Sequence, residues 1–261
     1  MPSNYAHYRF GAAMLSAMPG DIRQTVKRFR RLYDVGLHGP DILFYYNPLW
    51  RTKPGSLGKR IHQQSGKEFF GRVCRGIRLE PTREAEAYLY GLLCHYAVDS
   101  VCHPFVWEQD KNGIAEHIEL ETEFDRFLLD MDGKIPPENQ DLSLHLQLMP
   151  EECATVARFY PGATGKTVAT SLRRMTLVNK TLAIRGEGKR EWLKKGLGLA
   201  GWEYRGYVMT KAPNPQCCRL NKPLLERYIK AEERFPELLL QLNAHLTYNA
   251  PLGADFSQNF R

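Results

Sequence analysis

The sequence contains no apolar segment long enough to cross a membrane as a helix. Its longest uncharged apolar run is the twelve residues of Ala87–Val98, whereas a membrane-spanning helix needs about 20. The first residues contain neither a basic stretch nor a long apolar stretch, and so give no sign of a secretory signal. From these two absences we expect a cytoplasmic chain without a transmembrane segment.

Paired cysteine motifs are also missing. The chain has six cysteines, and none of them forms a Cys-x-x-Cys pair. Without a secretory signal, reduced thiols are expected. The adjacent Cys217 and Cys218 are interpreted as loop residues and not as a redox or soft-metal pair.

Signals of β-structure and of repeats are absent, whereas signals of helix recur along the chain. No Asn-Gly or Asp-Gly turn joins two alternating runs, which argues against β-hairpins. We predict one all-α domain over residues 1–261 with about seven to nine helices. Asp21 is expected to cap the first of these helices, and Pro104 is expected to end the third. The expected helices cover 22–35, 56–77, 82–103, 115–132, 150–160, 166–184, 189–199 and 222–247.

Three known functional signatures are missing. Neither the Glu-x-x-His motif of di-iron bundles nor the adjacent His-Asp dipeptide of another class of metal phosphohydrolases occurs. Gly165-Lys166-Thr167 ends like a phosphate-binding loop, but the first glycine of that motif is replaced by Tyr160. No strand is expected before it, so nucleotide binding there is excluded.

The chain carries a net charge of +7, which favours anionic partners in general. The basic residues fall in separate runs, 27–31 and 185–195 among them. Each run is interpreted as a solvated helix face. The charge alone therefore assigns no partner.

A set of polar residues interrupts the apolar run. His95, Asp99 and His103 follow one another at four-residue steps, so that they project from one face of a helix. His117 and Glu121 share a face of the next expected helix in the same way. Burying such groups without partners is costly, so that these side chains must meet either a hydrogen-bond network or a metal.

Imidazole and carboxylate groups are ligands for zinc, iron or manganese. A single histidine on an apolar face is usually satisfied by a backbone carbonyl, but five such groups on two consecutive helices are harder to satisfy in that way. The sequence therefore favours a metal site. The remaining polar residues of this region and the remaining histidines are expected to lie outside the metal site. Glu119, Glu123 and Asp125 are expected to face solvent, His38 to lie in a loop, and His145 and His245 to lie on amphipathic helices.

The run GLLCHYAVDSVCHPFV (91–106), followed by HIELE (117–121), resembles the zinc-dependent phospholipase C family. This family is all-helical and shares its metal site with the single-strand-specific zinc nucleases. The resemblance extends to three earlier ligands, which fall here on His7 in NYAHYRFG, Asp41 in HGPDILFYY and His62 in KRIHQQSG.

The resemblance implies a cluster of two or three zinc ions. A first ion would be held by Asp41, His62, His95 and Asp99. A second would be held by His103, His117 and Glu121, with one position left for water. Asp99 would bridge to a third ion, held by His7 and the chain's N-terminus. Asp41 would also act catalytically, by orienting or deprotonating the attacking water.

The N-terminus departs from the family pattern. Secreted members begin with a tryptophan whose amine and carbonyl bind a metal, whereas this chain begins Met1-Pro2-Ser3. The third site is therefore expected to be empty, completed by water, or served by the amine of Pro2.

Together these features predict a zinc-dependent phosphodiester hydrolase of phospholipase C type, acting on a phosphoester such as a phospholipid headgroup. One alternative is a nuclease on the same site, for which the chain offers aromatic stacking residues. The other is a non-catalytic metal-binding protein. The candidate stacking residues are Tyr45, Tyr46, Trp50 and Trp107.

Overall fold

The computed structural model describes residues 4–260 of the chain. These residues form α-helices and short 3₁₀ helices (η), and none of them forms a strand. The all-α class is thereby confirmed. The first half of the chain contains α1 (Asn4–Met14), α2 (Gly20–Arg28), α3 (Arg30–Gly36), η1 (Gly39–Tyr46), α4 (Lys53–Gln63), α5 (Gly66–Leu79), α6 (Arg83–Lys111) and α7 (His117–Met131). The second half contains η2 (Pro137–Asn139), α8 (Pro150–Ala157), α9 (Gly165–Leu182), α10 (Glu187–Ala200), η3 (Trp202–Tyr207), η4 (Cys218–Leu220), α11 (Asn221–Tyr248) and η5 (Ala254–Ser257).

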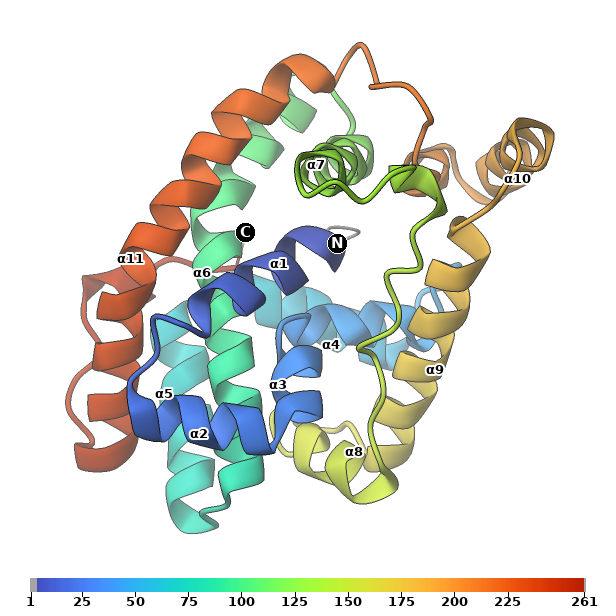
Figure 1. Ribbon diagram of the computed structural model, residues 1–261. Coiled ribbons are helices and arrows are strands. Elements are labelled where there is room, and N and C mark those ends of the chain that lie inside the picture. Colours follow the sequence, from blue (N-terminus) through green and yellow to red (C-terminus); the bar gives the residue numbers. More distant parts are fainter. Residues whose placement is uncertain (1–3, 261) are drawn as a thin grey trace.

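Helix α6 is the central element, and most of its residues are buried on all sides. It packs against α1, α2, α3 and α11, which surround it in Figure 1. The backbones of α3 and α6 come into direct contact at Gly36 and Gly91. A Cβ added at Gly91 would lie 2.2 Å from the carbonyl oxygen of Tyr33. This close approach brings the segment that follows α3 against the histidine-bearing part of α6.

Proline does not end α6 where the sequence predicted. The helix continues through Pro104 to Lys111. Proline removes one helical hydrogen bond, but Phe105 and Val106 are buried in the core. Their packing outweighs the local preference, which the sequence signal alone does not reveal.

Two of the expected helices are each divided in two. The segment 56–77 breaks where Ser65 caps α5 and forms a capping box with Glu68, a pattern that is visible in the sequence. The segment 22–35 breaks at Phe29, whose backbone leaves helical geometry (φ −112°, ψ 43°). Asp21 does not cap α2 but lies within its first turn, and Pro19 occupies the N-cap position.

None of the described helices is both long enough and apolar enough to span a membrane. All six cysteines are free thiols.

Candidate metal centre

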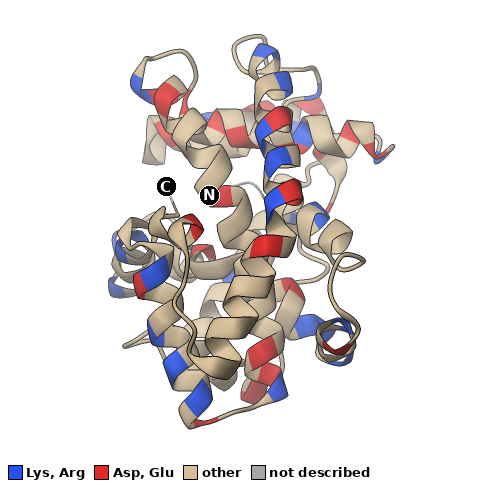
Figure 2. Cartoon of the chain, turned by 90° about the vertical axis from the view of Figure 1, so that its left-hand side faces the viewer, with Lys and Arg blue, Asp and Glu red and all other residues tan. Residues whose placement is uncertain are grey.

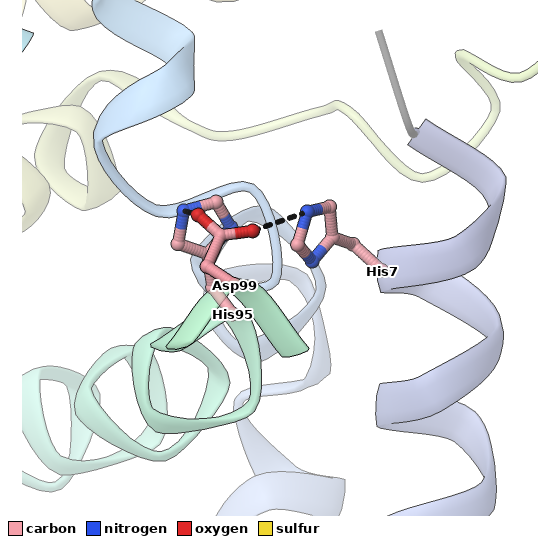
Figure 3. Close-up of side chains that lie close together, drawn as sticks. All are labelled: His7, His95 and Asp99. Atoms are coloured by element: carbon pink, nitrogen blue, oxygen red, sulfur yellow. Dashed lines mark ion pairs between the residues drawn. The ribbon is translucent and has the colours of Figure 1, made fainter. Parts of the chain in front are cut away.

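Asp99 lies at the centre of the site, on a buried turn of α6. Its Oδ1 is 3.3 Å from Nε2 of His7, and its Oδ2 is 3.1 Å from Nε2 of His95. Figure 3 shows His7 reaching Asp99 from α1 while His95 lies beside it on α6. Ligand atoms of these three residues all lie within 4.8 Å of one another. The structure thus brings the expected N-terminal ligand to the histidine face of α6.

A second group forms where η1 and α4 meet α6. Oδ1 of Asp41 is 2.9 Å from Nε2 of His62, and His95 completes a set of three within 4.8 Å. Oδ2 of Asp99 lies 3.9 Å from Nε2 of His62. His95 therefore belongs to two groups, and the first expected ligand set of Asp41, His62, His95 and Asp99 is assembled from three elements.

The third group joins α6 and α7. Nε2 of His103 is 3.0 Å from Oε1 of Glu121, and Nε2 of His117 is 3.2 Å from Oε2 of the same carboxylate. This group contains the three residues expected for the second ion. His103 also reaches Asp99, with its Nδ1 at 3.6 Å from Oδ2, so that all three groups are connected through Asp99.

Backbone carbonyls fix the ring nitrogens of three histidines. Nδ1 of His62 lies 2.8 Å from the carbonyl oxygen of Gly58, and Nδ1 of His95 lies 3.2 Å from that of Leu37. Nδ1 of His103 lies 2.5 Å from the carbonyl oxygen of Phe260. A carbonyl only accepts hydrogen bonds, so each Nδ1 carries the proton and donates it. Nε2 is then the nitrogen available for a metal, as is usual for metal-binding histidines.

The fixed tautomers leave nitrogen lone pairs facing carboxylates. Neither Nε2 of His62 nor Nε2 of His95 has a hydrogen-bond partner among the described residues, and the same holds for Oδ1 of Asp41 and Oδ2 of Asp99. Two acceptors at about 3 Å repel unless a cation or a proton lies between them. The donor set and these unpaired buried atoms fit a divalent metal such as zinc.

The pKa shifts of the buried groups also favour a bound cation. Burial opposes charge on His103, but the carboxylates of Asp99 and Glu121 raise its pKa to about 9. Burial would also raise the pKa of Asp99, yet the imidazoles of His103 and His95 hold it well below its usual value. Burial lowers the pKa of His7. The site thus contains ionised carboxylates that attract positive charge, in a region closed to solvent.

Gly39 provides the space for His95. Its φ is +48°, and a Cβ at this position would lie 2.4 Å from Cδ2 of the His95 ring. Only glycine adopts this conformation freely and also leaves room for the imidazole. Gly39 begins η1 and lies two residues before Asp41, so that the same turn positions both ligands.

Two acidic residues of α7 are buried, contrary to the expectation that they face solvent. The carboxylate of Asp125 accepts hydrogen bonds from the backbone N–H groups of Tyr5 and Ala6. It therefore satisfies the free amides of the first turn of α1, the helix that carries His7. Glu123 is buried against Arg126 and accepts hydrogen bonds from it at 2.7 and 2.8 Å. Burial of both acids shows that the polar face of α7 is covered by other parts of the chain.

The remaining histidines lie outside the three groups. His38 is buried, and its Nε2 lies 2.6 Å from Nε2 of His145. The expectation for His145 was wrong, because it lies in a turn after η2 and not on a helix, with its ring stacked on Tyr8. His245 lies on α11, as expected.

A pocket of about 910 Å³ borders the His103–His117–Glu121 group. His117 lines it, together with Trp107 at the end of α6. The His117 side chain is the most exposed of the ligands in this group, at 13%. Tyr45 and Trp50, two of the candidate stacking residues, also line the pocket. One ligand group is therefore reachable from the surface through a space large enough for a small organic molecule.

The sequence placed a possible ligand at the amine of Pro2, which lies outside the described residues. The structure also contains contacts that the sequence had not indicated, such as the carbonyl of Phe260 on His103. Since any residue can supply a backbone carbonyl, no residue type marks that contact in the sequence.

The fold and the site define a class of all-helical proteins in which buried histidines and carboxylates from several helices form a candidate metal cluster. Residues 6–158, more than half of the chain, match the family model of zinc-dependent phospholipase C. The chain belongs to the zinc-dependent phospholipase C family, as the resemblance predicted. No curated protein and no solved structure matches the chain significantly.

Proposed function

We propose that this chain is a metal-dependent phosphoester hydrolase of phospholipase C type, in which two or three zinc ions bind around Asp99. The observation that carries the proposal is the set of three ligand groups, one of which borders the pocket. Structural zinc is normally enclosed by four protein ligands, whereas catalytic zinc keeps a position for water. The group of His103, His117 and Glu121 offers three ligands beside an accessible space.

Each ligand group has a distinct part in the proposal. Asp41, His62 and His95 would hold one ion with help from Asp99, and His103, His117 and Glu121 would hold another. His7 and Asp99 would contribute to a third. Zinc bound there would polarise the phosphoryl oxygens and lower the pKa of water toward about 7.

Asp41 is the proposed proton acceptor. Burial acts to raise its pKa, but the net shift is downward, and a hydrogen bond with His62 and the charge of His95 contribute to it, so that the carboxylate is unprotonated at neutral pH. An unprotonated carboxylate within the ligand cluster can orient a water molecule and accept its proton. Asp41 would thus combine metal binding with catalysis.

The pocket is suited to a phosphoester with an organic substituent. Lys59 and Arg60 of α4 line it and offer positive charge to a phosphate. Tyr45, Tyr207 and Trp107 supply apolar surface on its wall. These features support a phospholipid headgroup as the substrate.

We also propose that residues 1–261 act as one domain, because ligands and their supports extend from His7 to Phe260.

The test combines metal analysis with hydrolysis of a chromogenic phosphodiester before and after chelation. We expect at least two zinc ions per chain and activity that is lost with the metal and restored by zinc. Asp41→Asn should reduce turnover far more than zinc content, since the amide keeps an oxygen ligand but accepts no proton. Asp21→Asn, an exposed change on α2, is the matched control.

Three outcomes would contradict the proposal. Less than one ion per chain, with no rise in melting temperature on adding zinc, would exclude the metal cluster. A fully loaded protein without activity on any phosphoester would favour a non-catalytic metal-binding protein. Preferential cleavage of single-stranded nucleic acid would favour the nuclease alternative, for which Tyr45, Trp50 and Trp107 in the pocket would supply stacking surfaces.

A further inference from the structure

The tryptophans of the chain gather at the pocket and beside it. The sequence has four. Trp50 and Trp107 line the pocket. Trp202 begins η3, whose next residue, Glu203, lines the pocket as well. Trp192 lies on α10, which packs against η3. Tryptophan prefers the boundary between water and the apolar part of a membrane, so that this grouping calls for an explanation beyond core packing.

Three of these tryptophans are turned to solvent. Trp50 is 72% exposed, Trp192 76% and Trp202 67%. Leu199 on α10 is 92% exposed. It follows Trp192 by seven residues, so that both lie on one face of the helix. Only Arg190 of α10 is buried, and Figure 1 shows the helix at the edge of the molecule beyond α9. This face of α10 therefore has no partner among the described residues.

A basic stretch of the chain borders the pocket, which Asp110, Glu116 and Glu203 also line. Residues 51–67, which include α4, contain five lysines and arginines and no acidic residue, and all five are exposed. On the side of the molecule that carries α11, basic and acidic residues alternate instead (Figure 2). Exposed tryptophan and leucine next to clustered basic residues are typical of surfaces that lie on anionic membranes.

We propose that the surface formed by Trp50, α4, η3 and the exposed face of α10 docks on an anionic lipid surface. Its aliphatic and indole side chains would enter the interfacial region while the lysines and arginines contact lipid phosphates. Leu199 favours lipid over nucleic acid, because an exposed aliphatic side chain offers nothing to a phosphate backbone or a base edge. The pocket mouth lies within this surface. Docking on the lipid surface does not depend on the proposed function. The proposed function concerns only the hydrolysis of a lipid headgroup that reaches the pocket.

The experiment measures binding of metal-loaded protein to vesicles, by sedimentation and by tryptophan fluorescence immediately after mixing. Vesicles of phosphatidylcholine with phosphatidylserine should bind the protein and shift its fluorescence to the blue, and added salt should weaken binding. The double variant Trp192→Glu, Leu199→Glu should bind at least about tenfold more weakly, because two apolar side chains are replaced by charges. Lys53→Gln with Lys195→Gln should weaken binding to anionic vesicles alone.

Matched controls lie on α11. Leu240 is 65% exposed there, and Leu240→Glu should bind vesicles like the unchanged protein, as should Lys222→Gln. All variants should keep their melting temperature and their hydrolysis of a soluble phosphodiester. Normal hydrolysis without vesicle binding would overturn the docking surface and leave the proposed function standing. Vesicle binding without any hydrolysis would overturn the proposed function and leave the docking surface standing.

Three further outcomes would overturn the docking proposal. One is equal vesicle binding by the double variant and the unchanged protein. Another is binding of single-stranded DNA in place of vesicles, with the same sensitivity to Trp192 and Leu199. The third is a dimer in sedimentation velocity that the double variant abolishes, since a second copy of the chain would then cover this face.

Discussion

Gly39→Ala tests whether the space beside His95 is essential to the centre. The substitution has two costs. A residue with a Cβ at φ +48° is strained by about 1–2 kcal/mol. The Cβ would also lie 2.4 Å from Cδ2 of His95, a ring that is fully buried and has no room to turn. Overpacking of this kind costs about 1–3 kcal/mol.

The two costs together predict a loss of about 2–5 kcal/mol in unfolding free energy. For a chain of this size each kcal/mol lowers the melting temperature by roughly 2–4 °C. His95 belongs to two ligand groups, so its displacement should also weaken zinc binding by about 10–100-fold, the range seen when groups that orient ligands are lost.

Two control variants separate these effects. Gly113 has φ +65° and nothing within 4 Å of an added Cβ, so Gly113→Ala reports the backbone strain alone and should leave zinc content unchanged. Gly76 lies within α5 with equally open surroundings, and Gly76→Ala should stabilise by about 0.5–1 kcal/mol. The assays are thermal unfolding and zinc titration. If Gly39→Ala and Gly113→Ala behave alike in both, the contact with His95 has no role in the centre.

Three more predictions concern the carboxylates and the ring charge. Asp99→Asn should remove the His7-linked ion first and spare the ion at His103 and Glu121, as seen by zinc stoichiometry and anomalous scattering at each position; uniform loss of all ions, or no loss of any, would show that Asp99 does not bridge two ions. Asp125→Asn should destabilise by about 1–3 kcal/mol, since the amide serves one backbone N–H and opposes the other, while Asp130→Asn, exposed on the same helix, should be neutral in thermal unfolding. In chelated protein the pKa of His103 is raised to about 9, so its stabilising charge is present below about pH 6.5 and is lost as the pH rises through 9. Zinc should abolish this pH dependence of the unfolding free energy, measured by urea titrations across that range. If the free energy changes with pH equally with and without zinc, His103 is not a ligand.

The part of the centre that lies on α6 and α7 could be predicted from spacing alone. His95, Asp99 and His103 share a helix face, and so do His117 and Glu121, because four-residue steps nearly repeat the helical turn. Spacing alone could not predict His7, Asp41 and His62. Each stands alone in its segment, and only the family resemblance pointed to them. The structure brings all eight residues into the three connected groups.

The errors arose where tertiary contacts override local signals. Pro104 was expected to end α6, but buried neighbours on its C-terminal side keep the helix going. Helix α1 was not expected at all, because its first amides are capped by Asp125, more than a hundred residues away in sequence. The break before α5 was the exception, since the capping box of Ser65 and Glu68 is local.

The last residues of the chain contribute to the centre through groups that leave no mark in a sequence pattern. The carbonyl of Phe260 fixes the His103 ring, and the Phe260 ring packs near those of His62 and His95. The hydroxyl of Tyr96 on α6 donates to the carbonyls of Asp255 and Gln258, which fastens this segment to the central helix. The family match ends at residue 158, well before it. Because a backbone carbonyl and apolar packing demand no single residue type, a chain can complete the same centre with a C-terminal region whose sequence shows no resemblance.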